Sequence, residues 1–303
     1  MLISIVIPTR HRPADLGRAV ESVLRQSHLP DQLLIIDQSN DRESRTRVDS
    51  LFATMGKRVD LIYVHDAGIP GLVAAKKIGV EKSSGDVIMF LEDDVVLDEN
   101  YVKTLAQGFL DHPEMMGSCG VVTLIASATG LYRWFFHFFH RGIFFDHRVG
   151  IHGNQNIIRD RMITSAFLSG GISAYRRTVF EKVPFDTAND FFMLEDIDFS
   201  TRAARVFGKD RFCINTGARL QHLMSPVNRA RLRIRYERKI REFICFYKKN
   251  RDQQLPLMNL SWLLIGLFLE ALFVSLTSGH YGPISGFFKG LITGFRWRIK
   301  PVL

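Results

Sequence analysis

The sequence has few cysteines and no recognisable secretion signal, and each absence excludes a class of protein. Only three cysteines occur in 303 residues, Cys119, Cys213 and Cys245. Three scattered thiols are too few for a disulfide framework or a zinc cage. The N-terminus enters the strand-like run Leu2–Ile7 at once, without a basic segment followed by an apolar one, so we expect no cleaved leader. The pattern favours reduced thiols and a cytoplasmic location.

The sequence also lacks a dinucleotide-binding fingerprint, internal repeats and a low-complexity linker. The residues after the first apolar run are Pro8-Thr9-Arg10-His11-Arg12, with no Gly-x-Gly-x-x-Gly. This excludes a dinucleotide-binding oxidoreductase. The net charge is +9, yet no nucleic-acid module accompanies it, so we expect no nucleic-acid partner. The charge favours an anionic bilayer or a diphosphate substrate instead.

The N-terminal third alternates between apolar runs and helical periodicity. The apolar runs are Leu2–Pro8, Leu33–Ile36, Leu61–Val64 and Val87–Leu91. Three helices are predicted between them: one with Pro13 in its first turn, a second that ends at about Phe52, and a third over Leu72–Val80. This order predicts a parallel sheet in an α/β fold. The runs end at polar residues: Thr9, Asp37, Asp66 and the triplet Glu92-Asp93-Asp94. Ligands of open α/β sheets bind beyond that edge, so we expect one shared crevice there.

Aromatic and basic residues are concentrated in the later part of the chain. An aromatic-basic insert lies near residues 131–148, and residues 229–251 hold ten Arg or Lys beside an apolar helical stripe. Leu257–Leu276 is nearly all apolar, and a Gly-rich basic tail follows it. We therefore divide the chain into an α/β domain at 1–228, which contains the insert, and a helical membrane-associated region at 229–303.

The apolar segment Leu257–Leu276 is long enough to cross a bilayer. However, Lys248 and Lys249 precede it and Arg296 and Arg298 follow it, whereas a span normally leaves positive charge on one side. This favours helices that lie in the plane of one leaflet. A single span and a buried hairpin or oligomer interface remain open alternatives.

The acidic triplet offers the oxygen ligands that Mg²⁺ and Mn²⁺ prefer. Alone, such a triplet is as readily a solvated turn after a buried strand. Its neighbours along the chain change this interpretation. The ordered motifs are Ile7-Pro8-Thr9-Arg10, Ile36-Asp37-Gln38-Ser39, Ala75-Lys76-Lys77, Phe90 to Asp94, Ser169-Gly170-Gly171, Tyr175-Arg176-Arg177, Leu194 to Phe199 and His222.

This order of motifs resembles the family 2 glycosyltransferases of the GT-A fold, over about residues 2–250. The resemblance implies a mixed, mainly parallel sheet flanked by helices. It also implies donor contacts from Pro8, Thr9, Arg10, Asp37, Lys76, Asp93, Gly170 and Gly171. Lys76 stands where many relatives carry Arg, so a diphosphate contact there keeps its charge and loses the bidentate fork.

The resemblance further implies a metal site and a catalytic base. Glu92 and Asp94 stand at the DxD motif, with Glu92 in place of the usual Asp, and His222 completes the site for Mn²⁺ or Mg²⁺. Asp196 is the predicted base that deprotonates the acceptor hydroxyl, and Glu195 supports it. The acids at the start of that helix could equally serve only its N-terminal dipole.

We therefore expect an inverting, metal-dependent glycosyltransferase at the cytoplasmic face of the membrane. Its substrates would be a nucleotide-sugar donor and a lipid-linked or glycan acceptor, and it could form oligomers. A processive polysaccharide synthase is disfavoured because it needs several spanning helices. A degenerate transferase fold that only binds a glycan or scaffolds partner enzymes remains the alternative. The sugar, the nucleobase and the linkage stay open.

Overall fold

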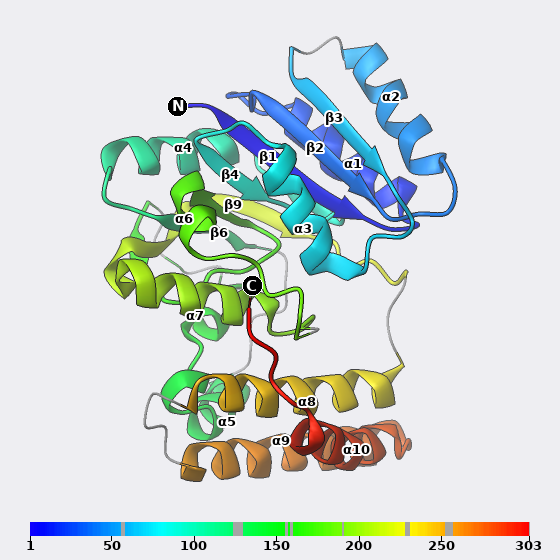
Figure 1. The fold of residues 1–303 in the computed structure, drawn as a ribbon, viewed down its shortest axis with the longest axis vertical. Helices are drawn as coiled ribbons and strands as arrows, with labels where there is room; N and C mark the ends of the chain where they lie inside the picture. Colours follow the sequence, from blue (N-terminus) through cyan, green and yellow to red (C-terminus); the bar gives the residue numbers. More distant parts are fainter. Residues whose placement is uncertain are drawn as a thin grey trace.

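The protein combines a large sheet covered by helices with a separate layer of helices (Figure 1). The computed structural model describes residues 1–55, 58–123, 130–154, 157, 160–189, 191–227, 231–251 and 257–302. Within these ranges the sheet has nine strands in the order β3-β2-β1-β4-β8-β6-β9-β5, and β7 pairs with β9.

The N-terminal half is the parallel α/β unit that the apolar runs predict. Its strands are β1 (Ile3–Thr9), β2 (Gln32–Asp37), β3 (Asp60–His65) and β4 (Val87–Phe90), and its helices are α1 (Pro13–Leu24), α2 (Glu43–Met55) and α3 (Gly71–Lys82). Strands β1, β2 and β4 are buried almost throughout, as their unbroken apolar runs require. Thr9 pairs with Asp37 and Asp37 with His65, so the carboxyl ends of these strands share one edge.

The second half of the sheet is mixed. It contains β5 (Val95–Leu97), β6 (Gly117–Val122), β7 (Met162–Thr164), β8 (Ser173–Arg176) and β9 (Phe212–His222), with α4 (Tyr101–Asp111), α6 (Arg177–Lys182), α7 (Glu195–Phe207) and the 3₁₀ turns η1 (Gly142–Phe144), η2 (His147–Gly150) and η3 (Lys209–Arg211). Strand β8 runs antiparallel between β4 and β6. This places the loop before β8, with Gly170 and Gly171, beside the acidic triplet after β4.

Four helices form the helical layer below the sheet in Figure 1: α5 (Gly130–Phe139), α8 (Leu232–Lys249), α9 (Leu257–Ser278) and α10 (Gly282–Arg296). Helices α8, α9 and α10 share a second apolar core that includes Ile240, Ile244, Leu263 and Phe287. The apolar stripe predicted for residues 229–251 is thus confirmed as a helix face, and its residues from Tyr236 onward are buried within the protein. Among the described residues, α9 alone is long and apolar enough to cross a membrane, and 33% of its most apolar stretch is buried.

The Gly-rich tail contains the helix α10, in agreement with the helical C-terminal segment expected from the sequence. Glycines recur at every fourth position of α10, at residues 282, 286, 290 and 294. A Cβ at Gly286 would lie 2.2 Å from the carbonyl oxygen of Arg233, and one at Gly290 would lie 2.7 Å from that of Glu237. The missing side chains let α10 pack directly on the backbone of α8.

The aromatic-basic insert joins the helical layer in space. The indole Nε1 of Trp262 in α9 donates to the carbonyl of Phe138 in α5 over 2.7 Å, and the Trp262 ring contacts the Phe139 ring at an angle of 32°. The domain boundary predicted at residue 228 falls outside the described residues and stays a prediction. The three cysteines are free and buried, as expected.

Candidate active site

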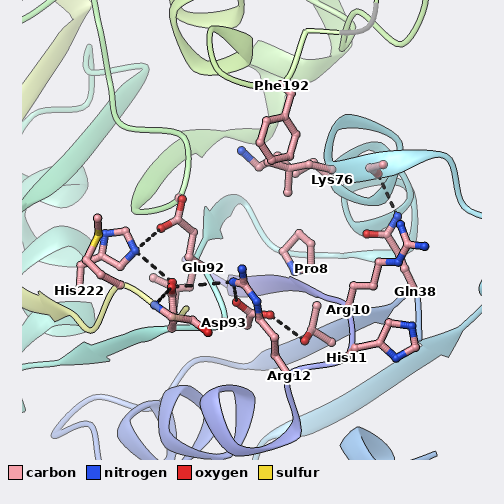
Figure 2. Close-up of a pocket in the computed structure, with 18 of the residues that line it drawn as sticks. Pro8, Arg10, His11, Arg12, Gln38, Lys76, Glu92, Asp93, Phe192 and His222 are labelled. Carbon is pink, nitrogen blue, oxygen red and sulfur yellow. Dashed lines mark hydrogen bonds and ion pairs between the residues drawn. The ribbon is translucent and has the colours of Figure 1, made fainter. Parts of the chain in front are cut away.

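A cavity of about 680 Å³ opens at the carboxyl ends of β1 and β4. This volume suits a small-molecule ligand. Figure 2 shows its polar wall, and the described lining residues are Pro8, Thr9, Arg10, His11, Arg12, Gln38, Gly71, Leu72, Lys76, Leu91, Glu92, Asp93, Asp94, Gly171, Phe192, His222, Met224, Ser225 and Arg238. Of the four strand ends predicted to share a crevice, those at Thr9 and at the acidic triplet line this cavity, whereas Asp37 and Asp66 are not among its described lining residues.

Glu92 and His222 lie on one side of this cavity (Figure 2), and Asp94 joins them there through His222. The His222 Nε2 lies 3.1 Å from Glu92 Oε2 and 3.1 Å from Asp94 Oδ1. Strand pairing causes this meeting, because Val95 of β5 lies opposite His222 in the β5–β9 ladder. One ligand atom from each of the three residues lies within 4.8 Å of the others. Two carboxylates and an imidazole at this spacing fit a divalent cation such as Mn²⁺.

Asp94 is held ready as an anionic ligand. Burial acts to raise its pKa, but hydrogen bonds from His222 and from the Ser225 backbone N–H outweigh burial and lower that pKa. The Ser225 N–H donates to Asp94 Oδ2 over 2.8 Å, and Arg12 Nη1 lies 3.8 Å from the same oxygen. Asp94 therefore stays ionised at neutral pH.

Asp93 points away from the metal group and ties the first strand to the triplet. Its Oδ2 accepts a hydrogen bond from the Thr9 hydroxyl over 2.8 Å, and its Oδ1 accepts one from Arg12 Nη1 over 2.9 Å. Burial raises the pKa of Asp93, and the Arg12 guanidinium opposes that shift. The predicted donor residues Thr9 and Asp93 thus contact each other on the cavity wall.

Lys76, predicted as a diphosphate contact, lines the cavity but is already paired. Its Nζ lies 2.5 Å from Glu195 Oε1 and donates to the Gly170 carbonyl over 2.8 Å. Both side chains are buried. Burial raises the pKa of Glu195, and the ammonium of Lys76 opposes that shift.

Asp37, predicted to contact the base or ribose, does not face the cavity. It is fully buried, its Oδ1 accepts from the Ser39 backbone N–H over 2.9 Å, and its Oδ2 accepts from Tyr63 Oη over 2.7 Å. These bonds fix the turn after β2, which presents Gln38 to the cavity instead. The prediction for Asp37 therefore finds no support in this conformation.

Gly170 and Gly171 leave room for acidic side chains. A Cβ at Gly171 would lie 2.3 Å from Glu92 Cδ, and one at Gly170 would lie 2.3 Å from Glu195 Oε1 and 2.8 Å from Asp196 Cβ. The sequence predicted close approach of the backbone to a sugar. The geometry gives these glycines a further role, because they let Glu92 and the start of α7 each approach this loop closely.

Asp196, the predicted base, packs against Gly170 and is not among the described residues that line the cavity. Its Oδ2 lies 2.5 Å from Arg148 Nη1, and its Oδ1 accepts from the Ile197 backbone N–H over 2.8 Å. Arg148 is buried and also pairs with Asp146 over 2.8 Å. In this conformation both oxygens of the Asp196 carboxylate accept hydrogen bonds from within the protein.

Comparison with known proteins decides the family. The model of "Glycosyl transferase family 2" matches residues 4–184, which is more than half of the chain. The chain belongs to this glycosyltransferase family. The match ends before Glu195, Asp196 and His222, so the roles of these three residues stay predictions.

Relatives of this glycosyltransferase include the O-antigen chain rhamnosyltransferase RfbN of Salmonella typhimurium, 25% identical over 75% of this chain and 68% of that protein. A glucosyl-dolichyl phosphate glucuronosyltransferase of Haloferax volcanii is 26% identical over 40% of this chain and 38% of that protein.

Solved structures confirm the predicted GT-A fold of the glycosyltransferase. A mannosyltransferase of Pyrobaculum calidifontis in complex with GDP-Man and Mn²⁺ has a TM-score of 0.62 at 12% identity, covering 97% of this chain and 87% of that chain. Residues 1–349 of TarS from S. aureus have a TM-score of 0.53 at 13% identity, covering 88% and 72%.

Sequence reasoning missed several residues of the glycosyltransferase cavity. Arg12 follows the first strand, and its position beside Arg10 was the available signal. Arg238 of α8 lies with its guanidinium 4.8 Å from the ring centre of Phe192, and both residues line the cavity. No local motif marks this pair, because it forms only when the helical layer meets the loop before α7.

Proposed function

We propose that this glycosyltransferase is a metal-dependent, inverting enzyme that moves a sugar from a nucleotide-diphosphate donor to an acceptor hydroxyl. The observation that carries the proposal is the group Glu92, Asp94 and His222 on the wall of a cavity whose rim is basic. The mannosyltransferase solved with GDP-Man and Mn²⁺ supports the donor class and the ion.

The chain's own residues would divide the work as follows. Glu92, Asp94 and His222 would hold Mn²⁺ or Mg²⁺, which when bound offsets the negative charge that develops on the departing diphosphate. Pro8 and Arg10 would border the nucleoside, at the mouth formed by β1. Asp93 keeps Arg12 beside Asp94, so the guanidinium limits repulsion between the two carboxylates and a diphosphate.

Asp196 would act as the general base. The acceptor oxygen forms a bond to the anomeric carbon, the bond from that carbon to the diphosphate oxygen breaks, and the acceptor proton passes to Asp196. In-line displacement inverts the anomeric carbon. Lys76 and Glu195 would hold the loop at Gly170 against α7 while this happens.

The acceptor is proposed to be a glycan linked to a membrane lipid, at the cytoplasmic face. Large apolar side chains are exposed on the helical layer, among them Leu131, Trp134, Met258, Phe273, Leu276, Phe288, Ile292 and Phe295. Exposed apolar surface of this extent marks an interaction site. The relative named for glucosyl-dolichyl phosphate supports a lipid-linked acceptor.

One observation favours a second candidate, a transferase fold that only binds a glycan. Both Glu195 and Asp196 are held in ion pairs, with Lys76 and Arg148. A protein without catalytic activity would tolerate a base that is permanently engaged.

A turnover experiment separates the two functions. The purified chain is incubated with UDP-, GDP- and dTDP-sugars and Mn²⁺, and nucleoside diphosphate release is measured with and without EDTA. If the protein is an enzyme, we expect release of nucleoside diphosphate that is abolished by EDTA and by Asp94→Ala. The Asp196→Asn variant should lose turnover but still bind the donor. Donor binding without turnover by the wild type supports the glycan-binding alternative. For any product formed, NMR of the anomeric proton reports inversion or retention.

A further inference from the structure

Glu242, on the buried side of α8, binds the loop that precedes α7. Its side chain is almost fully buried. One oxygen, Oε2, accepts hydrogen bonds from three successive backbone N–H groups, of Phe192 over 3.1 Å, Met193 over 2.7 Å and Leu194 over 3.0 Å. A single carboxylate oxygen thus fixes three consecutive residues of the chain.

These three residues lie where their position affects the active site. Phe192 lines the cavity, and Leu194 is the N-cap residue of α7, which begins with Glu195 and Asp196. No side chain of α7's own N-terminus caps the helix. Glu242 supplies the negative group favoured just before a helix N-terminus, and it does so from another helix.

Other contacts attach the same segment to the helical layer. Lys249 of α8 lies 2.5 Å from Asp186 Oδ2 and 2.6 Å from Asp198 Oδ1. Asn189 exchanges two hydrogen bonds with the backbone of Lys300, at 2.9 Å and 2.8 Å. Lys249 therefore ties Asp186 and Asp198, one on each side of the Glu242 contact, to α8, and Asn189 is bonded to the tail that follows α10.

The layer itself gives α8 little freedom to move. Helix α10 packs on α8 through the glycine positions, with backbone carbonyls within 3 Å of where a Cβ would stand. On their exposed side, Lys289 of α10 pairs with Glu237 of α8 over 3.1 Å. A rigid α8 passes any shift of the helical layer on to the loop at Phe192.

We propose that Glu242 is a positioning residue for sugar transfer, which holds the cavity wall at Phe192 and the start of α7 in register with the donor site. The inference rests on the proposed function. It also gives the helical layer a role in the reaction besides attachment, because the layer carries the group that sets the active-site loop.

The second oxygen of Glu242 distinguishes this carboxylate from a glutamine at the same position. Oε1 is buried with no hydrogen-bond partner among the described residues, and Arg241 Nη2 is 3.8 Å from it. Burial raises the pKa of Glu242 to about 7, against the opposing effect of the three N–H groups. A glutamine at this position keeps one carbonyl acceptor for these N–H groups but is neutral and places an amide where Oε1 finds no partner.

Three variants test the proposal: Glu242→Leu, Glu242→Gln and Glu237→Gln. Glu237→Gln is the matched control, because Glu237 lies on the same helix and bonds α10 rather than the loop. The measurements are hydrogen exchange of amides 192–194, affinity for UDP or GDP with Mn²⁺, and kcat and KM for the nucleotide-sugar that the wild type hydrolyses fastest.

We expect Glu242→Leu to expose amides 192–194 to exchange and to lower kcat by at least about tenfold, which corresponds to 1.36 kcal/mol. Glu242→Gln should lose several-fold, and Glu237→Gln should match the wild type. Nucleotide affinity and donor KM should change less than kcat in both Glu242 variants, because the metal group is untouched although Phe192 lines the cavity, and neither should change in Glu237→Gln.

Two results overturn the positioning role. One is a kcat in Glu242→Gln and Glu242→Leu equal to that of the wild type. The other is a loss of nucleotide affinity in proportion to kcat, which indicates general destabilisation; if the leucine variant does not fold, the glutamine variant decides alone. Absence of nucleotide binding and turnover in the wild type instead overturns the proposed function, and the positioning role with it.

Discussion

At the scale of single residues, Gly171 determines where the Glu92 carboxylate can lie. Its missing side chain leaves the space that Glu92 fills, and the Glu92 backbone N–H donates to the Gly171 carbonyl over 2.8 Å. We predict that Gly171→Ala displaces Glu92 from His222 and weakens Mn²⁺ binding by about tenfold or more, as for other residues that orient metal ligands. Titration calorimetry with Mn²⁺ measures this. Unchanged affinity would show that Glu92 adjusts without losing the ion.

A second prediction at this scale concerns pH and His152. Its Nδ1 accepts from the Val122 backbone N–H over 3.2 Å, so its Nε2 carries the proton and donates to Ser169 Oγ over 2.9 Å. Burial lowers the pKa of His152 to about 4, from an ordinary value of about 6.5. Between these values the unfolded chain binds more protons than the folded one, so folding stability falls as pH falls from about 6.5 to 4.

The His152→Gln variant isolates this contribution. Urea unfolding of the wild type and the variant at pH 7 and pH 5 should show a smaller loss of stability in the variant, because glutamine does not titrate. Equal losses in both proteins would mean that His152 does not have a lowered pKa in the folded state.

The sequence was most informative for the metal group at this scale. It singled out Glu92, Asp94 and His222, and the structure brings their ligand atoms within 4.8 Å of one another. It was less informative for Asp37 and Lys76, because burial and ion pairing depend on partners from distant segments such as Tyr63 and Glu195. No pattern around a single residue reveals such partners.

At the scale of elements, the parallel half could be predicted because each strand there is an unbroken apolar run between helices. The second half could not. Its strands β5, β7 and β8 have three or four residues, too few for a periodic pattern, and they pair with segments distant in the chain. In α10 the glycines, which disfavour a helix in isolation, are compensated by close packing on α8.

We predict that Gly286→Ala destabilises the helical layer. The new methyl group would stand 2.2 Å from the Arg233 carbonyl oxygen, a backbone atom that can move only with α8. Overpacking of this kind costs about 1–3 kcal/mol, and a lowered melting temperature measures it.

The matched control is Gly130→Ala at the start of α5, where a Cβ meets nothing within 4 Å. This variant should be neutral or slightly more stable, because alanine restricts the unfolded chain. An equal loss of stability in both variants would contradict the close packing of α8 and α10.

At the scale of the whole molecule, one face of the helical layer is apolar and the flanking segments are basic. The acidic residue of α9, Glu270, turns inward and pairs with Lys239 over 2.8 Å, which leaves the outer face of that helix uncharged. An uncharged apolar face bordered by Lys and Arg fits the surface of an anionic bilayer.

We predict that the double substitution Phe273→Glu and Phe295→Glu lowers binding to phosphatidylglycerol vesicles by more than tenfold, since each exposed aromatic contributes about 1.5–3 kcal/mol on burial. Vesicle co-sedimentation measures this. Leu110→Glu on α4 is the control, because Leu110 is equally exposed but lies on the sheet half. Equal binding by the wild type and the double variant would exclude this face as the membrane-binding surface. If only detergent extracts the protein from membranes, a spanning α9 is favoured instead.

The central claim is that Glu92, Asp94 and His222 bind the cation that holds the donor diphosphate. Calorimetric titration of Mn²⁺ into the wild type, Asp94→Ala and Asp66→Ala, with and without UDP or GDP, tests it most directly. Asp66 also follows a strand at this edge but lies outside the group. The account predicts one site in the wild type and in Asp66→Ala, tighter with nucleotide and weakened by more than about tenfold in Asp94→Ala. Mn²⁺ binding to Asp94→Ala with wild-type affinity would contradict it.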